Sequence, residues 1–339
     1  MADRFKVVSL GKFGGGPMIA EERELGGLDA EIELVEARCT TEDELIAAAG
    51  DADAIIGGGR FFTRRVLEAL PRCRVIATYS VGYDTIDVDA ATDNNIIVVN
   101  NPAKCWCVEE VSNHALALLL ASAKKLTIQH NLTKQGRWTD AKQELAPMAP
   151  VHDQTLGLVG CGNIGRMTAR KARCFGMRIL GYDPYVDKAL AEEYGITLTS
   201  LPELLKESDF VSVHAFLNEE TRHLMGETEF RQMKPSAYLI NTARGPIVDE
   251  AALIKALQEK WIAGAGLDVF EIEPVAADNP LLQMDSVVVI PHSASYSDTA
   301  VEVNSINPAQ EVARVLCGKW PNNPVNETVK PKVDLVRED

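Results

Sequence analysis

Short apolar runs rich in valine and isoleucine alternate along the chain with longer segments of helical periodicity. This alternation is typical of βαβ units and predicts parallel sheets. In the first hundred residues we expect five strands, at 6–10, 31–35, 54–56, 75–77 and 96–99. A second series of six strands is expected at 155–159, 178–182, 210–213, 237–241, 263–268 and 286–290. The pattern therefore predicts two α/β units, each a doubly wound parallel sheet.

Two helix-length segments lie outside the two strand series. Residues 108–125 are rich in alanine and leucine and predict a helix, and the polar segment after it, with Pro147 and Pro150, looks like a connection between domains. Residues 300–316 return to helical periodicity and are followed by a tail rich in proline and asparagine at 321–326. This tail is too short to fold alone, and the helix before it needs another surface on which to bury its apolar face.

Composition and charge exclude several classes of protein. The 339 residues include 34 basic and 49 acidic side chains, a formal net charge of −15, and no basic stripe suited to nucleic acid or anionic lipid. The longest apolar stretch, 115–121, is far shorter than the roughly 18–20 residues of a membrane-spanning helix. The first residues lack the apolar core of a secretory signal. We therefore expect a cytoplasmic protein with neither a nucleic-acid nor a membrane partner.

The cysteines predict free thiols. There are seven, an odd number without a repeating spacing, which suits a reducing compartment. Cys105 and Cys107 offer two soft ligands, but a closed zinc site needs four, and no second ligand pair lies nearby. We expect no metal site.

A glycine-rich turn follows the first strand of the second series. Residues 155–165 read as a buried strand that runs into G-x-G-x-x-G and then into a helix. Gly160 would permit the tight turn, Gly162 would let the backbone approach a pyrophosphate, and Gly165 would allow close packing of helix on strand. Asn163 and Ile164 complete the turn. The helix N-terminus offers free N–H groups, so a diphosphate can bind there without a basic residue.

An aspartate in the right place supports dinucleotide binding. Asp183 ends the next strand, 18 residues after Gly165, where its carboxylate would accept hydrogen bonds from ribose hydroxyls. It would repel a 2′-phosphate, and no arginine follows it, so the sequence favours NAD over NADP. A methyltransferase that binds S-adenosylmethionine can present a similar glycine turn and remains an alternative at this point.

Three polar residues follow three later strands. Arg244, Glu273 and His292 are separated by 29 and 19 residues, and each comes after the end of a predicted strand. Ligands of open parallel sheets bind at that edge, so the three side chains are expected to converge. Each of them alone has an ordinary structural reading, as a turn residue, a loop carboxylate or a cap.

These motifs resemble, in order and spacing, those of the D-isomer-specific 2-hydroxyacid dehydrogenase family. The resemblance covers nearly the whole chain and includes residues 80–87, similar to the substrate loop of that family. It implies a flavodoxin-like substrate domain made of residues 1–102 and 294–339, and an NAD-binding Rossmann domain made of residues 103–293. It also implies hinges near Pro102 and His292 and a substrate crevice between the domains.

The resemblance implies a reversible hydride transfer between NADH and a 2-oxo acid. Arg244 would clamp the carboxylate and polarise the carbonyl, and His292 would act as general acid and base. Glu273 would stabilise the protonated imidazole and orient the ring. Backbone N–H groups around Ser80, Val81 and Gly82 would share the carboxylate.

Further cofactor contacts follow only from the resemblance. They are the residues His214, Asn218, Thr221, Thr242, Ala243 and Asp268. Residues 214–217 depart from the proline-containing version common in the family, which leaves the contacts of that loop open. The side chains that select the substrate would come from loops near Arg60, Tyr79, Cys105 and Tyr296.

Two other functions and an oligomeric state are weighed within the same family. Residues 218–220 and 183–185 are similar to the C-terminal-binding protein branch of NAD-sensing corepressors. Ser295 and Thr78, however, stand where that branch has tryptophan and arginine, and there is no extended disordered tail to recruit partners. A phosphite or formate dehydrogenase is the other alternative. We expect a homodimer that pairs through the cofactor domains, as is usual in the family.

Overall fold

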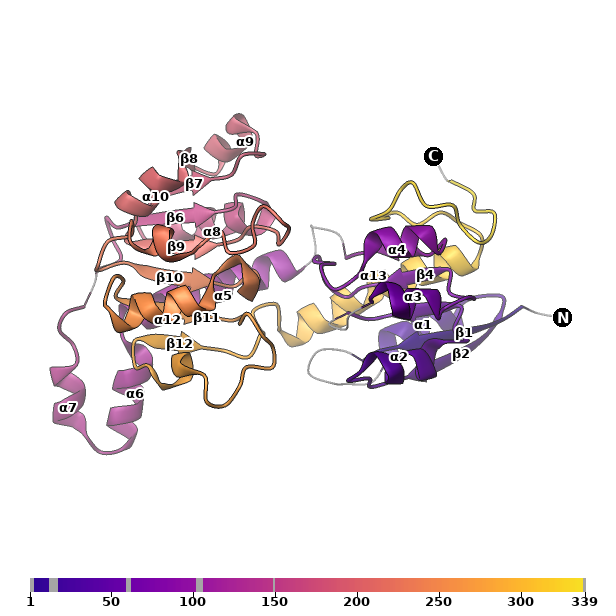
Figure 1. Cartoon of the computed structure of the whole chain (residues 1–339), viewed down its shortest axis with the longest axis horizontal. Helices are drawn as coiled ribbons and strands as arrows, with labels where there is room; N and C mark the ends of the chain where they lie inside the picture. The colour runs from indigo at the N-terminus through magenta and orange to yellow at the C-terminus, as the bar shows by residue number, and fades with distance from the viewer. Residues whose placement is uncertain (1–2, 12–17, 59–61, 102–105, 149, 338–339) are drawn as a thin grey trace. The chain divides into compact units, whose positions relative to one another are not determined.

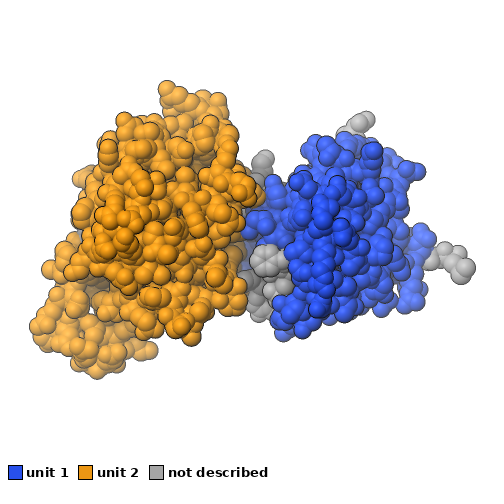
Figure 2. Space-filling view, in the orientation of Figure 1, with its two compact units in different colours: residues 1–107, 297–339 blue, residues 108–296 orange. Residues whose placement is uncertain are grey.

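The structure is a computed structural model, and it describes residues 3–11, 18–58, 62–101, 106–148 and 150–337. The chain divides into two compact units: unit 1 contains residues 1–107 and 297–339, and unit 2 contains residues 108–296 (Figure 2). The first expected domain boundary, at 102/103, lies outside the described residues. The second was expected at 293/294, whereas the units divide at 296/297.

Unit 1 is built on a parallel sheet of five strands in the order β2-β1-β3-β4-β5. The strands are β1 (Arg4–Ser9), β2 (Glu31–Glu36), β3 (Ala54–Ile56), β4 (Val75–Ala77) and β5 (Ile97–Val99). Every residue of β3, β4 and β5 is buried, which explains why these strands read as continuous apolar runs. The order is that of flavodoxin-like domains, so the predicted fold class is confirmed for this unit.

Helices cover both faces of the sheet in unit 1. They are α1 (Ile19–Gly26), α2 (Glu42–Ala49), α3 (Arg64–Glu68), α4 (Val88–Asp93) and α13 (Asp298–Leu316). Successive strand side chains point to opposite faces, so Ile55 and Ile76 pack with α2, α3 and α4. Val75 and Ile97 pack with α1 and α13 on the other face. The helix expected at 300–316 therefore finds the apolar surface that it needs.

The C-terminal tail is anchored to β5 by the side chain of Asn326 and by the backbone bond from Val325 N–H to the carbonyl of Val98 at 2.8 Å. Asn326 is buried, and its Oδ1 accepts a hydrogen bond from Val98 N–H at 2.9 Å. Its Nδ2 donates to the carbonyl of Ile96 and to Thr92 Oγ1, both at 2.9 Å. These bonds satisfy backbone groups on the free side of an edge strand, and they fix the tail to unit 1.

Unit 2 contains a parallel sheet of seven strands in the order β12-β11-β10-β9-β6-β7-β8. The strands are β6 (Thr155–Val159), β7 (Arg178–Tyr182), β8 (Thr197–Leu198), β9 (Phe210–Val213), β10 (Tyr238–Asn241), β11 (Gly264–Leu267) and β12 (Val287–Val289). β6 pairs with β7 on one side and with β9 on the other, so the chain order reverses there, as in Rossmann domains. β8 was not predicted, because two residues at a sheet edge are too short to show a pattern.

The helical segments of unit 2 follow the predicted alternation, with one difference. They are α5 (Trp106–Ala123), which contains the division between the units, α6 (Leu126–Lys134), α7 (Trp138–Gln143), α8 (Asn163–Arg173), α9 (Lys188–Glu193), α10 (Leu201–Glu207), α11 (Glu227–Phe230), η1 (Gly245–Ile247), α12 (Glu250–Gln258) and η2 (Pro280–Gln283). The expected polar connection after α5 contains α6 and α7, which pack on each other and project from the sheet (Figure 1). α6 is nine residues long and buries none of them, so it adds nothing to the apolar core of the unit. Within the described ranges, no helix has the length and apolar content to cross a membrane.

Replacing Asn326 by alanine should destabilise unit 1, because the change leaves the N–H of Val98 and the carbonyl of Ile96 buried without this partner. A loss of about 2–4 kcal/mol in the free energy of unfolding is expected. Urea unfolding measures this loss of free energy, and hydrogen exchange of the β5 amides shows whether it occurs in unit 1. Asn323→Ala, in the same tail, removes a side chain without a hydrogen bond in the described structure and should cost less than about 0.5 kcal/mol. Equal losses in the two variants would show that the Asn326 side chain does not anchor the tail.

Candidate functional site

The glycine-rich turn has the geometry that its sequence predicted. Gly160 follows β6 with a φ of +97°, and a Cβ there would lie 2.5 Å from the backbone nitrogen of Ala215. A Cβ on Gly165 would lie 2.3 Å from the carbonyl oxygen of Gly160, so α8 packs directly on the turn. A Cβ on Gly162 would meet nothing within 4 Å. Two glycines are therefore required by packing, and the third leaves open space at the start of α8.

A cation is held at this turn. Arg166 Nη1 donates to the carbonyl of Cys161 at 2.8 Å, and Nη2 donates to Oδ1 of Asn163 at 2.7 Å. Sequence reasoning missed Arg166, because an arginine one residue after the third glycine resembles a solvated helix residue. The glycine turn therefore carries a positive charge that diphosphate binding at a helix N-terminus does not itself require. This charge lies beside the N-terminus of α8, which has no side-chain cap.

Asp183 lies beside the glycine turn, as its spacing predicted. Its Oδ2 accepts a hydrogen bond from the N–H of Cys161 at 2.8 Å. Its Oδ1 accepts from the N–H groups of Tyr185 and Val186 at 2.9 and 3.1 Å. The side chain at the end of β7 is therefore fixed against the turn after β6.

The loop after β9 uses its polar side chains to hold its own shape. Asn218 N–H donates to Thr221 Oγ1 at 2.8 Å, and Thr221 N–H donates to Asn218 Oδ1 at 3.0 Å. His214 Nε2 lies 2.9 Å from Ser212 Oγ. Burial lowers the pKa of His214 to about 4, so this imidazole is neutral at physiological pH. The loop stands at the carboxyl end of β9, next to the glycine turn.

Asn241 shapes the turn that carries Arg244. Its Nδ2 donates to the carbonyl of Arg244 at 3.0 Å, and its Oδ1 accepts from the N–H of Ala243 at 3.0 Å. Arg244 is half-buried, and its Nη1 donates to the carbonyl of Ala243 at 2.8 Å. The Oγ1 of Thr242 is buried without a hydrogen-bond partner among the described residues. The asparagine that precedes the predicted site residues thus fixes their backbone.

Asp268 ties the end of β11 to the loop that carries His292. The residue is 1% exposed, and its carboxylate accepts hydrogen bonds from the N–H groups of Ser293 at 2.6 Å and Ala294 at 3.1 Å. Its carbonyl accepts from the N–H of His292 at 2.8 Å. Burial raises the pKa of Asp268, and these N–H groups and the nearby histidine charges offset only part of the rise. This buried carboxylate therefore holds the loop after β12 in place.

Glu273 and His292 form a hydrogen-bonded pair. Glu273 Oε2 lies 2.6 Å from His292 Nδ1, and the Glu273 Oε1 accepts from the N–H of Phe270 at 2.9 Å. Burial alone would raise the pKa of Glu273, but the hydrogen bond and charge of His292, the N–H of Phe270 and the charge of Arg244 bring it below its usual value. His292 has a φ of +50°, a left-handed conformation uncommon outside glycine. The side chains of His292 and Glu273 are 39% and 34% exposed, so both are accessible to a ligand.

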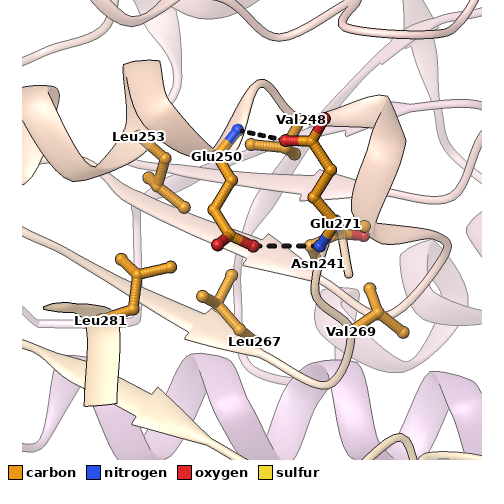
Figure 3. Close-up of a pocket in the computed structure, with 9 residues that line it drawn as sticks. Asn241, Val248, Glu250, Leu253, Leu267, Val269, Glu271 and Leu281 are labelled. Carbon is orange, nitrogen blue, oxygen red and sulfur yellow. Dashed lines mark hydrogen bonds between the residues drawn. The ribbon is translucent and has the colours of Figure 1, made fainter. Parts of the chain in front are cut away.

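A reciprocal clasp supports the loop that carries Glu273 (Figure 3). The N–H of Glu250 donates to Glu271 Oε2 at 3.2 Å, and the N–H of Glu271 donates to Glu250 Oε2 at 3.0 Å. His223 Nε2 lies 2.7 Å from Glu271 Oε1. The two carboxylates line a hollow of about 10 Å³ with largely apolar walls, far smaller than the roughly 300–1,000 Å³ of ligand pockets. The clasp therefore joins the start of α12 to this loop and is structural.

The predicted substrate loop belongs to unit 1. Ser80, Val81 and Gly82 follow β4 and are half-buried. None of the described residues accepts a hydrogen bond from the N–H groups of these three residues. Two further positions named from the sequence, Arg60 and Cys105, lie outside the described residues.

Comparison with known proteins decides the family. Residues 116–294 match the NAD binding domain of the D-isomer specific 2-hydroxyacid dehydrogenases, and residues 18–133 match the catalytic domain of the same family. The chain belongs to this family. It is an oxidoreductase that acts on CH–OH donors and uses a nicotinamide dinucleotide.

Two curated relatives illustrate the range of the family. A glyoxylate reductase of Korarchaeum cryptofilum is 44% identical over 265 residues, which are 78% of this chain and 79% of the relative. A D-3-phosphoglycerate dehydrogenase of Methanocaldococcus jannaschii is 39% identical over 298 residues, 87% of this chain. The match spans only 56% of that dehydrogenase.

Two solved structures share the fold over almost their whole length. The TT0316 protein from Thermus thermophilus has a TM-score of 0.84 at 33% identity, with 94% of this chain and 99% of that chain covered. An acyclic imino acid reductase in complex with NADPH and D-Arg has a TM-score of 0.80 at 30% identity, with the same coverage. The second structure shows a phosphorylated dinucleotide on a related protein, which makes the choice between NAD and NADP a question for this chain's own residues.

The low pKa of Glu273 predicts a pH-dependent contribution to the stability of unit 2. The folded state holds this carboxyl ionised more strongly than the unfolded chain does, so the contribution is present above about pH 4.5 and is lost as the pH falls below that value. Glu273→Gln should therefore lower the Tm at pH 6 by about 1–3 °C, a small effect because the pair is partly solvated. The difference should vanish towards pH 3 in a series of thermal melts. Glu259→Gln, at an exposed helix end, should follow the parent protein throughout, and a Glu273→Gln difference that stays constant with pH would contradict the assignment.

Proposed function

We propose that the protein is an NAD-dependent reductase of small 2-oxo acids, with Arg244, Glu273 and His292 as its catalytic residues. The observation that carries this proposal is the 2.6 Å pair of Glu273 and His292, with the charge of Arg244 close enough to lower the pKa of Glu273. Reduction of a 2-oxo acid requires a cation that binds the substrate carboxylate and an acid that protonates the carbonyl oxygen. A guanidinium and an imidazole oriented by a carboxylate supply these two functions. The glyoxylate reductases among the relatives make glyoxylate the first substrate to test.

Arg244 is suited to bind the substrate carboxylate and to polarise the neighbouring carbonyl. Its guanidinium is permanently charged and presents a planar fork of donors, which matches a carboxylate in a bidentate manner. Its backbone is fixed by Asn241 at 3.0 Å. We also assign carboxylate binding to the N–H groups of the loop at Ser80, Val81 and Gly82, which donate to no described residue.

His292 is the group that transfers the proton. Glu273 binds Nδ1 and thereby fixes the ring orientation, and Nε2 donates a proton to the carbonyl oxygen as negative charge develops there. A bound nicotinamide supplies the hydride. In the opposite direction Nε2 accepts the hydroxyl proton, and Glu273 stabilises the resulting imidazolium.

The residues at the carboxyl edge of unit 2 fit a dinucleotide. The open space at Gly162, the uncapped start of α8 and the nearby Arg166 suit a pyrophosphate. Asp183 uses three of its roughly four acceptor positions within the chain, which leaves one for a ribose hydroxyl. The same carboxylate would lie against the 2′-phosphate of NADP, so NAD is the favoured cofactor. The remaining cofactor contacts are Asn163, Ile164, His214, Asn218, Thr221, Thr242, Ala243 and Asp268.

We propose a homodimer that forms through unit 2. The helices α6 and α7 project from the sheet, and large apolar side chains remain exposed on them, with Leu126 53% and Trp138 62% accessible. Exposed apolar surface on a small projecting element is typical of an interaction site. A second copy of unit 2 is the partner that we propose for it.

We infer that the protein works in the reducing environment of the cytoplasm. Six cysteines of the described part are free thiols, namely Cys39, Cys73, Cys107, Cys161, Cys174 and Cys317. Free thiols are the state that a reducing compartment maintains.

The purified protein should oxidise NADH in the presence of at least one member of a panel of 2-oxo acids that begins with glyoxylate, hydroxypyruvate and pyruvate. His292→Ala should lower kcat by about 10²- to 10⁴-fold, because it removes the proton donor. Arg244→Lys should lower kcat/KM, because the fork is lost. Loss of NADH absorbance measures the rates, and fluorescence titration should give an unchanged Kd for NADH.

His152→Ala is the matched control, since His152 is exposed and its ion-pair partner is its neighbour Asp153. Turnover that survives His292→Ala would remove His292 as the acid. If the parent protein binds NADH but reduces none of the acids, the reductase proposal fails. Phosphite and formate are then assayed with NAD as the next candidate substrates. If neither reacts, an NAD-sensing binding protein is the remaining alternative.

Asp183→Asn should weaken discrimination against NADP. The change removes a negative charge from the ribose position, so the ratio of the Kd values for NADPH and NADH should fall by about tenfold, equivalent to about 1.4 kcal/mol. Fluorescence titration of both reduced cofactors measures the ratio. Asp187→Asn is the control, because asparagine still caps α9 and a nearby charge of the same sign is removed. An equal change in both variants would mean that general charge, not the position of Asp183, sets the preference.

A further inference from the structure

In the loop that follows β4, every backbone carbonyl from residue 79 to residue 82 accepts a hydrogen bond. Asn101 Nδ2 donates to the carbonyl of Tyr79 at 3.0 Å. Thr78 Oγ1 and the N–H of Asn101 both donate to the carbonyl of Ser80, at 2.8 and 3.0 Å. Asn100 Nδ2 donates to the carbonyl of Val81 at 2.7 Å. Four consecutive carbonyls are bound, because Ser80 Oγ donates to the carbonyl of Gly82 at 2.6 Å.

The bound carbonyls determine where the N–H groups point. In a planar trans peptide, the C=O of one residue and the N–H of the next are antiparallel. The carbonyls of Tyr79, Ser80 and Val81 point towards their donors. The N–H groups of the same three peptides, which belong to Ser80, Val81 and Gly82, therefore point away from those donors. Those three N–H groups donate to no described residue. Successive N–H groups that are free on one side of a loop form a concave anion-binding site.

The two asparagines reach the loop because of the strand order. β5 pairs with β4 in parallel, so the carboxyl ends of both strands lie at the same edge of the sheet. Asn100 and Asn101 come directly after β5, and the loop comes directly after β4. A side-chain amide carries two donors on a short stem, which suits it to bind a neighbouring carbonyl.

We propose that Asn100, together with Asn101 and Thr78, is a positioning residue that aims the N–H groups of the 80–82 loop at the substrate carboxylate. This inference rests on the proposed reduction of 2-oxo acids, in which that loop binds the carboxylate. The ligand class is a small carboxylate anion, which the loop binds through backbone dipoles without a charged side chain. Asn100 is the residue to change, because it is half-buried, whereas Asn101 and Thr78 are each 1% exposed and support the core.

Asn100→Ala in the full-length protein saturated with NADH is the test, with oxalate as the anion probe and glyoxylate as the substrate. Without the hydrogen bond from Asn100 to the carbonyl of Val81, the orientation of the peptide between Val81 and Gly82 is no longer fixed. The N–H of Gly82 is then no longer aimed at the carboxylate. We expect the Kd for oxalate and the KM for glyoxylate to rise about tenfold, while kcat changes less than about threefold and the Kd for NADH stays the same. Thr78→Val keeps the side-chain shape but removes one donor, and it should raise the same two quantities by a smaller factor.

The matched control is Asn94→Ala. Asn94 Nδ2 donates to the carbonyl of Ala90 at 2.8 Å, the same kind of bond in the same unit, at the end of α4 and not on this loop. Its oxalate affinity should equal that of the parent protein. If Asn100→Ala fails to fold, as a thermal melt would show, Thr78→Val decides by the same titration.

The outcomes separate this inference from the proposed function. An Asn100→Ala variant that folds and binds oxalate as the parent does overturns the positioning role, even if the parent reduces glyoxylate. A parent protein that fails to bind oxalate overturns it as well. A parent protein that reduces no 2-oxo acid but binds oxalate, with loss of binding in Asn100→Ala, supports the positioning role and refutes the reductase.

Discussion

All seven strands of the sheet in unit 2 run in the same direction, and this one constraint places the site residues of that unit. Parallel strands end at the same edge, so residues separated by more than a hundred positions meet there once the strands pair. The glycine turn follows β6, Asp183 follows β7, Arg244 follows β10, and His292 follows β12. Each side chain is far from the others in sequence, and none needs a long loop to reach the edge.

Buried polar groups then hold the loops at that edge. Asp268 is buried at the end of β11, where a carboxylate would be costly without partners, and it accepts hydrogen bonds from the N–H groups of Ser293 and Ala294. These bonds hold the loop next to His292, whose backbone is in a left-handed conformation uncommon outside glycine. The clasp between Glu250 and Glu271 fixes the loop two residues before Glu273. The short contact between Glu273 and His292 therefore depends on backbone bonds made by residues that take no part in proton transfer.

The sequence predicts this arrangement wherever the signal is a long apolar run or a motif of fixed spacing. The strand series, the glycine turn and the distance to Asp183 are of this kind, and the structure places them together. β8 was missed because a two-residue edge strand shows no pattern. α6 and α7 were missed because both helices are short and they bury at most one residue each, Ala141 in α7. Arg166 was missed because solvated and site arginines look the same in a sequence. The roles of Asn100 and Asn101 depend on which strand lies beside β4, and only the strand order reveals that neighbour.

The discontinuous make-up of unit 1 has a consequence for synthesis on the ribosome. One face of its sheet is covered by α1 and α13, and α13 is translated only after the whole of residues 108–296. At about 5–20 residues per second, those residues take roughly 10–40 s to emerge, and during that time Val75, Ile97 and their neighbours lack the part of their cover that α13 provides. Unit 2 is continuous and can complete its fold first. Until α13 emerges, the nascent chain therefore exposes part of the apolar sheet of the earlier unit, a surface of the kind that chaperones bind.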